Sequence, residues 1–356
     1  MELSLRGALW IVATGVIVAG LYFLRGPLTQ FAMALILWLA IDGFAAVIAK
    51  RVPFAPRWLA LPAALVFVLG LVALTGWVVV INVGAMMEQW GLYEQRLNQV
   101  MAQSYGALGI GGVAPTVGDL VARLDPARVA TEIGEGLQNL ASDVIFILIF
   151  LGFLFPAAAV MAEKLDRIFT DPQRRQAARD VGQRIRVSME RYLWVQTVVS
   201  LIITALTYAT LVILGLEHAL FWSFVIFFLN FVPTIGSVVA VVLVTAVALA
   251  QFTDLTRVAA VCIGTSAWQF LIGNFVYPRM TGESLNLSAL VVLLALAIWG
   301  AIWGMAGAFL AAPLTVMLMI VLAQFPSTRW IAILLSADGK PTPETGRMSK
   351  SESGSN

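Results

Sequence analysis

The sequence predicts an all-α polytopic membrane protein with about six full transmembrane helices and two broken or re-entrant helical hairpins. Three observations predict this class. Hydrophobic residues make up 60% of the 356 residues, charged residues make up only 12%, and the mean hydropathy is +0.90. A soluble domain averages about 25% charged residues. The charges are also separated by long apolar runs, and a helix that crosses the hydrocarbon core needs roughly 20 apolar residues.

The charge-free runs locate the spans in chain order. Each of six segments is long enough for one span, if the second is extended past Asp42. These segments are 7–24, 26–49, 58–87, 144–162, 192–216 and 258–278. The first is longer than a typical signal-peptide core and lacks a convincing cleavage site, so we expect a retained span.

Two further segments are too long for one ordinary span. Residues 218–253 form a charge-free run of 36 residues, which is about 54 Å as a single helix. Pro233 and Gly236 interrupt this run, and proline breaks the helical hydrogen-bond ladder. Residues 284–328 form a run of 45, interrupted by a glycine-rich stretch at 299–307. We favour a re-entrant hairpin for the first segment. For the second, a hairpin and two closely packed full spans fit about equally well.

The positive charges predict the orientation. Residues 163–191 contain eight Lys and Arg against five acids, whereas residues 88–143 contain three Arg against seven acids. If the N-terminus is cytoplasmic and both long segments return to the side they left, 17 of the 22 Lys and Arg are cytoplasmic. Positive loops stay in the cytoplasm. We therefore expect both termini inside and residues 88–143 outside.

These features divide the chain into six parts. Helices are expected at 88–104 and 126–140, the second with Asp125 as its N-cap. The C-terminal end, from Lys340, has a composition typical of disorder. The parts are the first three transmembrane helices (1–87), an extracytoplasmic cap with amphipathic helices (88–143), the fourth span (144–162), a basic cytoplasmic helix (163–191), a transport region (192–328) and a cytoplasmic tail (329–356).

Composition also excludes several functions. One cysteine and one histidine rule out a disulfide framework and a multi-histidine metal site. A net charge of +2 gives no electrostatic support for binding nucleic acid. No catalytic dyad and no phosphate-binding Walker motif is present, so transport would depend on a gradient. We expect no enzymatic activity, no cofactor and no metal, and as partners a small-molecule or ion substrate and the lipid bilayer.

Polar residues inside the membrane are the candidates for a transport path, because burying them unpaired is costly. Gln269 and Asn274 lie about 140° apart on a helix, so one faces the hairpins while the other packs elsewhere. At the breaks, a ligand path and a structural role in capping freed backbone groups fit equally well. The candidates are Asn230, Pro233, Thr234, Gly236 and Ser237 at the first break, Gln269 and Asn274 in the seventh segment, and Gly304 and Gly307 at the second break.

Asp42 is the one candidate for proton coupling. It lies seven residues before Lys50, near the end of its span, where it either pairs with Arg51 at the interface or titrates during transport. We favour the interfacial role. A monovalent cation/proton antiporter needs a titrating carboxylate deep in the membrane, so this alternative is the weaker one.

Three blocks of sequence resemble a known family. Residues 192–196 are Tyr-Leu-Trp-Val-Gln, and residues 230–236 are Asn-Phe-Val-Pro-Thr-Ile-Gly. A third block extends from Asn274 to Leu314 and includes Pro-Arg-Met-Thr-Gly at 278–282. Together they resemble the autoinducer-2 exporter family of bacterial inner-membrane transporters. The chain differs at Thr234, where the family often has an aromatic residue, and at Ser237, where it often has a second proline.

The resemblance implies a multi-pass permease of the bacterial inner (plasma) membrane that works without ATP hydrolysis and forms a homo-oligomer. Some relatives export autoinducer-2, and others are similar to sodium/proton antiporters. The function we predict is a secondary transporter that exports a small polar molecule, with an autoinducer-2-like molecule as the candidate solute. The alternatives are the antiporter and a non-transporting membrane scaffold, which would have no need of broken polar helices.

Overall fold

The structure is a computed structural model that describes residues 2–51, 60–88, 90–107, 116, 118, 126–281 and 286–341. In this part of the chain the regular structure is helical, apart from a single antiparallel β-bridge between Leu287 and Ser336. Among the described residues, five helices are long and apolar enough to cross a membrane. The predicted all-α polytopic fold is therefore confirmed, while the number of spans and the orientation of the termini stay predictions.

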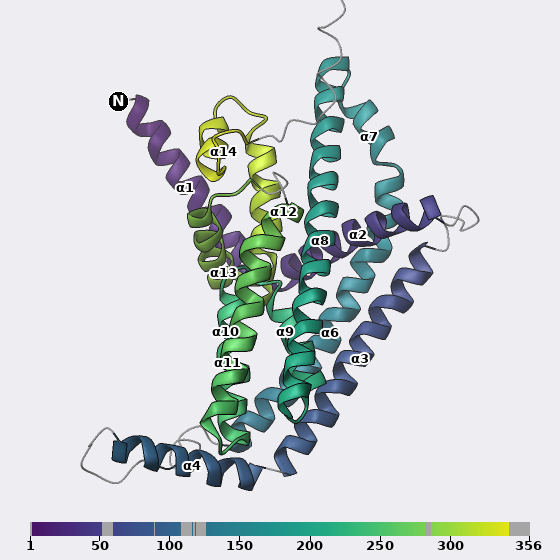
Figure 1. Ribbon diagram of the computed structural model, residues 1–356. Coiled ribbons are helices and arrows are strands. Elements are labelled where there is room, and N and C mark those ends of the chain that lie inside the picture. The colour runs from purple at the N-terminus through teal and green to yellow at the C-terminus, as the bar shows by residue number, and fades with distance from the viewer. Residues whose placement is uncertain are drawn as a thin grey trace, which may run out of the picture. The chain divides into compact units, whose positions relative to one another are not determined.

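Figure 1 shows the helices in chain order. The predicted amphipathic helix at 88–104 corresponds to α4. The helices are α1 (Glu2–Phe23), α2 (Arg25–Arg51), α3 (Ala60–Glu88), α4 (Trp90–Ala107), α6 (Pro126–Ala159), α7 (Met161–Ile168), α8 (Pro172–Leu214), α9 (Ala219–Leu229), α10 (Ile235–Gln251), α11 (Leu255–Leu271), the π-helix η2 (Ile272–Val276), α12 (Tyr277–Thr281), α13 (Ala289–Leu322) and α14 (Arg329–Leu335).

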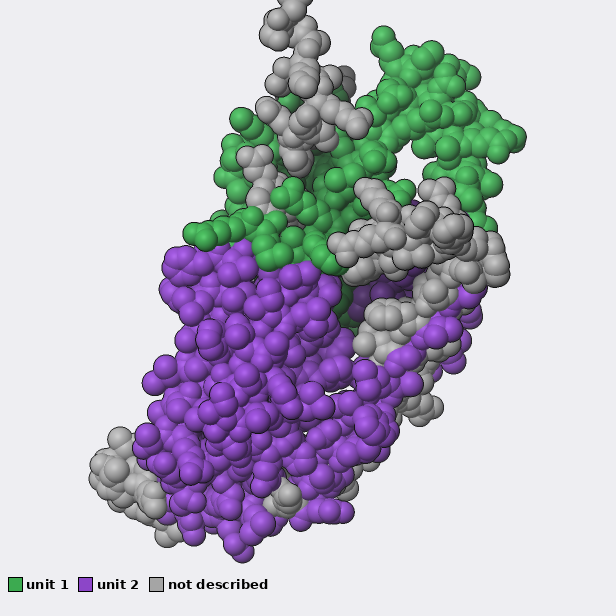
Figure 2. Space-filling model, turned by 45° about the vertical axis from the view of Figure 1, so that its right-hand side comes forward, with its two compact units in different colours: residues 1–29, 156–195, 278–356 green, residues 30–155, 196–277 purple. Residues whose placement is uncertain are grey.

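The chain forms two compact units, which Figure 2 shows in different colours. Unit 1 contains residues 1–29, 156–195 and 278–356, and unit 2 contains residues 30–155 and 196–277. Unit 2 holds α9, α10 and α11, and unit 1 holds α13 and α14. Because α8 continues from one unit into the other, the predicted boundary at residues 191 and 192 falls inside a helix.

Helix α10 shows why the helices of unit 2 pack closely. Its buried positions recur mostly every fourth residue, at Gly236, Ala240, Val244 and Ala248. Residues four apart lie on one face of a helix, and small side chains on that face let neighbouring backbones approach. Helix α10 packs against α9, α11 and α4, and it forms the centre of unit 2.

The basic segment 163–191 is divided between α7 and the first part of α8. Helix α8 starts at Pro172, and the Asp171 carboxylate accepts the backbone N–H of Gln173 at 3.0 Å. Within unit 1, Asp166 on α7 pairs with Arg179 on α8, and Arg186 pairs with Glu190 at 2.7 Å. Exposed ion pairs of this kind contribute about 0–1 kcal/mol each, so they mainly set the geometry of this helical turn.

Helix α6 differs from the pattern expected from the sequence. Residues 126–140 and 144–162 were predicted as separate helices, whereas α6 runs from Pro126 to Ala159 without a break. The polar residues between them do not interrupt it, since Asp143 accepts a hydrogen bond from Gln30 at 2.7 Å. The predicted N-cap Asp125 and the tail residues 342–356 lie outside the described residues.

Both long apolar segments are broken. Helix α9 has 11 residues, about 16 Å, which is too short to cross a hydrocarbon core of about 30 Å. Helix α13 has 34 residues but turns back on itself at Gly304. Its Trp299 Nε1 donates to Thr315 Oγ1 at 3.2 Å, although these residues are 16 apart in sequence. In a straight helix they would be about 24 Å apart, so the chain reverses within the second segment. Whether its two arms form a re-entrant hairpin or two full spans stays a prediction.

Candidate functional site

The turn of the first hairpin, residues 230–234, is held in a strained conformation. Thr234 has φ +62° and ψ −55°, and the Ile235 N–H donates to the Pro233 carbonyl oxygen at 2.6 Å. This is a γ-turn of the positive-φ type, which is rare and strained for a residue with a side chain. Such outliers cost about 1–3 kcal/mol and gather at functional sites. The Ser237 hydroxyl supports the turn by donating to the Thr234 carbonyl oxygen at 2.7 Å.

A close backbone approach closes the same hairpin. A Cβ atom on Gly236 would overlap the carbonyl oxygen of Leu229 at the end of α9. Only glycine allows the first turn of α10 to approach the last turn of α9 so closely. The sequence signal of a proline and a glycine three residues apart therefore marks a tight chain reversal.

Two glutamines from other helices hold Asn230 at this turn. Gln196, on α8 and only 6% exposed, donates its Nε2–H to the Asn230 main-chain oxygen at 2.7 Å. Gln269, on α11, donates its Nε2–H to Asn230 Oδ1 at 3.0 Å. Asn230 follows the last residue of α9, where main-chain carbonyls lack helical partners. One glutamine therefore caps the broken helix, and the other fixes the asparagine side chain.

Several buried polar atoms of this hairpin have no hydrogen-bond partner. Within the described residues, six buried side-chain nitrogen or oxygen atoms have no hydrogen-bond partner, and all belong to residues between positions 204 and 245. Buried polar groups without partners are rare in proteins and call for an explanation such as a ligand. The six are Thr204 Oγ1 on α8, His218 Nε2 before α9, Trp222 Nε1 and Ser223 Oγ on α9, Asn230 Nδ2 at the turn, and Thr245 Oγ1 on α10.

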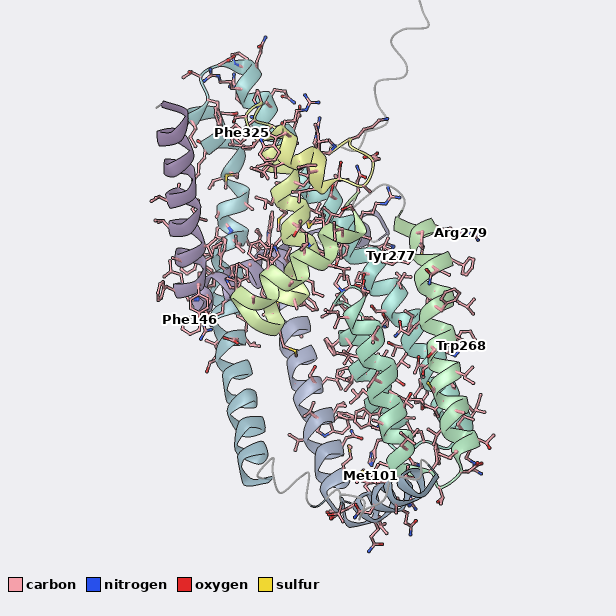
Figure 3. All side chains as sticks on the ribbon, turned by 90° about the vertical axis from the view of Figure 1, so that its left-hand side faces the viewer. Met101, Phe146, Trp268, Tyr277, Arg279 and Phe325 are labelled. Atoms are coloured by element: carbon pink, nitrogen blue, oxygen red, sulfur yellow. The ribbon has the colours of Figure 1, made fainter. Side chains whose placement is uncertain are left out.

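The helix that carries Gln269 becomes a π-helix just beyond it. Helix α11 passes into η2 and then α12, and Figure 3 shows Trp268, Tyr277 and Arg279 along this continuous element. A π-helix turn is uncommon and is frequent at functional sites. Trp268 Nε1 donates to Thr210 Oγ1 on α8 at 2.9 Å, which fixes α11 against α8 close to Gln269.

A second polar network lies at the opposite end of the first hairpin. The ring nitrogen Nδ1 of His218 contacts Asn82 Oδ1 at 2.9 Å, and Gln251 donates to the Gly215 carbonyl oxygen at 3.0 Å. Arg96 on α4 donates to the Gln251 main-chain oxygen. Burial raises the pKa of the Tyr93 hydroxyl, and the neighbouring Glu217 carboxylate raises this pKa further. This network anchors the base of the hairpin to α3 and α4.

The second hairpin has a turn of different chemistry. Gly304 has φ +64° and ψ −145°, a region that is essentially restricted to glycine. A Cβ on Gly307 would overlap the carbonyl oxygen of Trp299 on the opposite arm. Thr315 accepts the Trp299 indole N–H and donates its hydroxyl to the Ala311 carbonyl oxygen at 2.7 Å. Trp303 Nε1 donates to the Leu21 carbonyl oxygen at 3.1 Å, so the second turn has its polar groups paired.

The structure brings part of the predicted path together. Pro233, Thr234, Gly236 and Ser237 form one turn around Asn230, which Gln269 reaches from α11. Asn274 is exposed, and its amide donates to the Phe270 carbonyl oxygen of its own helix at 2.9 Å. Gly304 and Gly307 belong to the hairpin of unit 1.

Asp42 is half-buried on α2, and the side chain of Arg51 lies outside the described residues. The roles of Asp42 and of the path residues in transport stay predictions. Sequence reasoning did not place Gln196 in the site. Its available signal was a glutamine with Ser200 one turn later on an apolar helix, both buried.

Apolar helices that surround a strained, broken hairpin with unpartnered polar groups define a polytopic membrane protein of the permease type. Comparison with known proteins agrees. The chain belongs to the AI-2E family of transporters, because the model of the AI-2E family transporter matches residues 11–327. Curated proteins that resemble it carry the names of transport proteins or permeases, which supports a membrane transporter.

Three relatives show the range of similarity. The AI-2 transport protein TqsA of Escherichia coli K12 is 31% identical over 228 residues, which are 63% of this chain and 65% of that protein. A putative transport protein of Borreliella burgdorferi is 32% identical over 183 residues, 51% of this chain and 50% of the relative. The putative transport protein YhhT of E. coli K12 is 28% identical over 225 residues, 62% and 63% respectively. The chain thus spans between half and two thirds of these relatives.

Proposed function

We propose that this chain is a secondary transporter that exports a small polar solute, and that the first hairpin, α9–α10, lines the path. The observation that carries the proposal is the turn at 230–234, where a strained backbone and the unpartnered side-chain nitrogen of Asn230 occur together. A turn that served only to reverse the chain would need proline and glycine alone. Polar groups kept unpaired in an apolar bundle are explained by a solute that pairs with them in passing.

The driving force in this proposal is an ion or solute gradient. The sequence has no Walker motif, and within the described residues no cluster of three or more metal-binding side chains occurs. Discontinuous helices are the recurring device by which gradient-driven carriers bind substrate near the bilayer midplane. Autoinducer-2 is the first solute to test, because a relative at 31% identity bears its name. We further propose the bacterial plasma membrane as the location and a homo-oligomer as the assembly.

The test is efflux from proteoliposomes. Purified protein is reconstituted in vesicles loaded with autoinducer-2, and release is followed with and without a proton gradient. We expect protein-dependent release that Gln196→Leu slows, because the Asn230 carbonyl loses its partner. The matched control is Gln324→Leu, since the Gln324 amide, just after α13, reaches only the Ile320 carbonyl oxygen four residues earlier at 3.3 Å.

Two results would overturn the proposal. If autoinducer-2 were released no faster than from liposomes without protein, autoinducer-2 would be excluded as the solute. If wild type and Gln196→Leu released it at equal rates, the first hairpin would be excluded from the transport path. Sodium-driven proton movement that disappears in Asp42→Asn would support the antiporter in its place.

A further inference from the structure

In the side-chain amide of Asn230, the oxygen has a hydrogen-bond partner and the nitrogen has none. Its Oδ1 accepts the Nε2–H of Gln269 at 3.0 Å, while its Nδ2 is buried without a partner. The main-chain oxygen of the same residue already accepts the Nε2–H of Gln196 at 2.7 Å. Each acceptor oxygen of Asn230 thus holds a donor from the protein, and its side-chain N–H groups are left for another molecule.

Helix α9 supplies a second polar group without a hydrogen-bond partner, the hydroxyl of Ser223. Ser223 is 1% exposed and its Oγ has no partner. It lies seven residues before Asn230, which is two helical turns, or about 10 Å, along the same face. The indole N–H of Trp222, the residue before Ser223, is likewise buried and has no hydrogen-bond partner. The face of α9 therefore presents hydrogen-bond donors at two depths.

The chemistry of these atoms discriminates between ligands. An amide N–H and an indole N–H only donate, whereas a hydroxyl both donates and accepts. In the described residues none of the six unpartnered buried atoms is a carboxylate or amide oxygen. Hard monovalent and divalent cations need several oxygen ligands. A solute with acceptor oxygens satisfies the free N–H groups of Asn230 and Trp222, and a bare cation does not.

We propose that Gln269 is a positioning residue that determines whether the first hairpin offers hydrogen-bond donors or acceptors to a solute. By donating to Asn230 Oδ1 it turns the Asn230 amide so that the N–H groups face the path, and the turn then selects solutes that offer a carbonyl, carboxylate or hydroxyl oxygen. This inference rests on the proposed function and adds the feature of the solute that the site reads. Without the Gln269 donor, the amide is free to rotate by half a turn and present its oxygen.

The experiment measures both solute affinity and coupling between the two residues. Autoinducer-2 efflux is measured in proteoliposomes for wild type, Asn230→Leu, Gln269→Leu and the double variant, with Gln324→Leu as the matched control. We expect each single variant to raise the apparent KM about fivefold, which corresponds to about 1 kcal/mol for a neutral hydrogen bond. Because Gln269 acts through Asn230, the double variant should be no worse than Asn230→Leu. The maximal rate per folded molecule should change less than KM.

A second measurement keeps the inference testable without transport. Thermal unfolding of detergent-solubilised protein is followed with added autoinducer-2 and with added sodium ions. We expect stabilisation of the wild type by the solute, loss of that stabilisation in Asn230→Leu, and no stabilisation by sodium. Sodium stabilisation that depends on Asn230, or additive KM effects in the double variant, would overturn the proposed role of Gln269. Failure of the wild type to transport autoinducer-2 while these binding results hold would overturn the proposed transport function alone.

Discussion

The hairpin formed by α9 and α10 and the hairpin within α13 share one packing device and differ in their turns. In both, a glycine shortly after the turn packs on a carbonyl oxygen of the opposite arm, Gly236 on Leu229 and Gly307 on Trp299. The first turn places a threonine at φ +62°, whereas the second places a glycine at φ +64°. The same chain reversal is thus made once with strain and once with little.

The two hairpins also differ in how completely their buried polar groups are hydrogen-bonded. The arms of α13 are joined by the bond between Trp299 and Thr315, and none of the unpartnered buried atoms found in the described residues belongs to α13. Five of the six belong to residues 218–253, and the sixth, Thr204, belongs to α8. The buried polar side chains of α13 therefore have hydrogen-bond partners, whereas several of those in the first hairpin have none.

Substitution of the two closely packed glycines should give the largest effect. We expect Gly236→Ala and Gly307→Ala to lower the free energy of unfolding by about 3 kcal/mol or more each, because the new methyl group overlaps main-chain atoms that cannot rotate away. Chemical unfolding in detergent measures this change. Gly152→Ala is the control, since a Cβ there meets nothing within 4 Å. Wild-type stability in either hairpin variant would show that the close approach is absent in solution.

The turn of the second hairpin is expected to come next. Gly304→Ala forces a side chain into a backbone region that is essentially restricted to glycine. The free energy of unfolding should fall by about 1–3 kcal/mol, as measured by the same unfolding curves. A neutral result would mean that the α13 turn adopts another conformation, and the comparison of the two turns would lose its basis.

The turn of the first hairpin should respond in the opposite direction. Thr234→Gly removes the strain of a side chain at φ +62°, at the cost of a more flexible unfolded chain, so we expect a net stabilisation of about 1 kcal/mol. If the strained turn serves transport, efflux should slow as stability rises. Destabilisation by this substitution would indicate that Thr234 contributes contacts that outweigh its strain.

The smallest effect concerns Asp338, which follows α14 and binds Asn286 in the loop before α13. Hydrogen bonds from the Asn286 amide and the Lys340 N–H lower the pKa of the exposed Asp338 carboxyl. A folded-state pKa below the unfolded one gives stability that is present above about pH 4 and is lost as the pH falls through the folded pKa. The difference in unfolding temperature between wild type and Asp338→Ala should therefore shrink in acid. A difference independent of pH would contradict this.

Sequence reasoning succeeded where local physics determines the outcome. The charge-free runs predicted apolar helices, and Pro233 with Gly236 predicted the first break, because proline and missing side chains act on the backbone nearby. Gln269 was predicted to lie on a helix facing the hairpins or another interface, and the structure shows that it reaches Asn230.

Features that depend on distant partners were not predictable. Asp143 lies within α6 and accepts a hydrogen bond from Gln30, 113 residues away in sequence, which its own neighbourhood does not indicate. Gln196 reaches Asn230 across 34 residues, and nothing in its own neighbourhood indicates which carbonyl it would cap. The contact between Trp299 and Thr315, which shows that the second long segment folds back on itself, likewise joins residues far apart along a helix.

The shortness of α9 also constrains how the protein is made. Eleven apolar residues are about half of what a nascent segment needs to enter the bilayer as a span. The first hairpin therefore waits for later helices before its polar turn is stable in lipid. Gln269 follows Asn230 by 39 residues, which at 5–20 residues per second is about 2–8 s of synthesis. During that interval Asn230 lacks Gln269, one of the two glutamines that bind it in the folded protein.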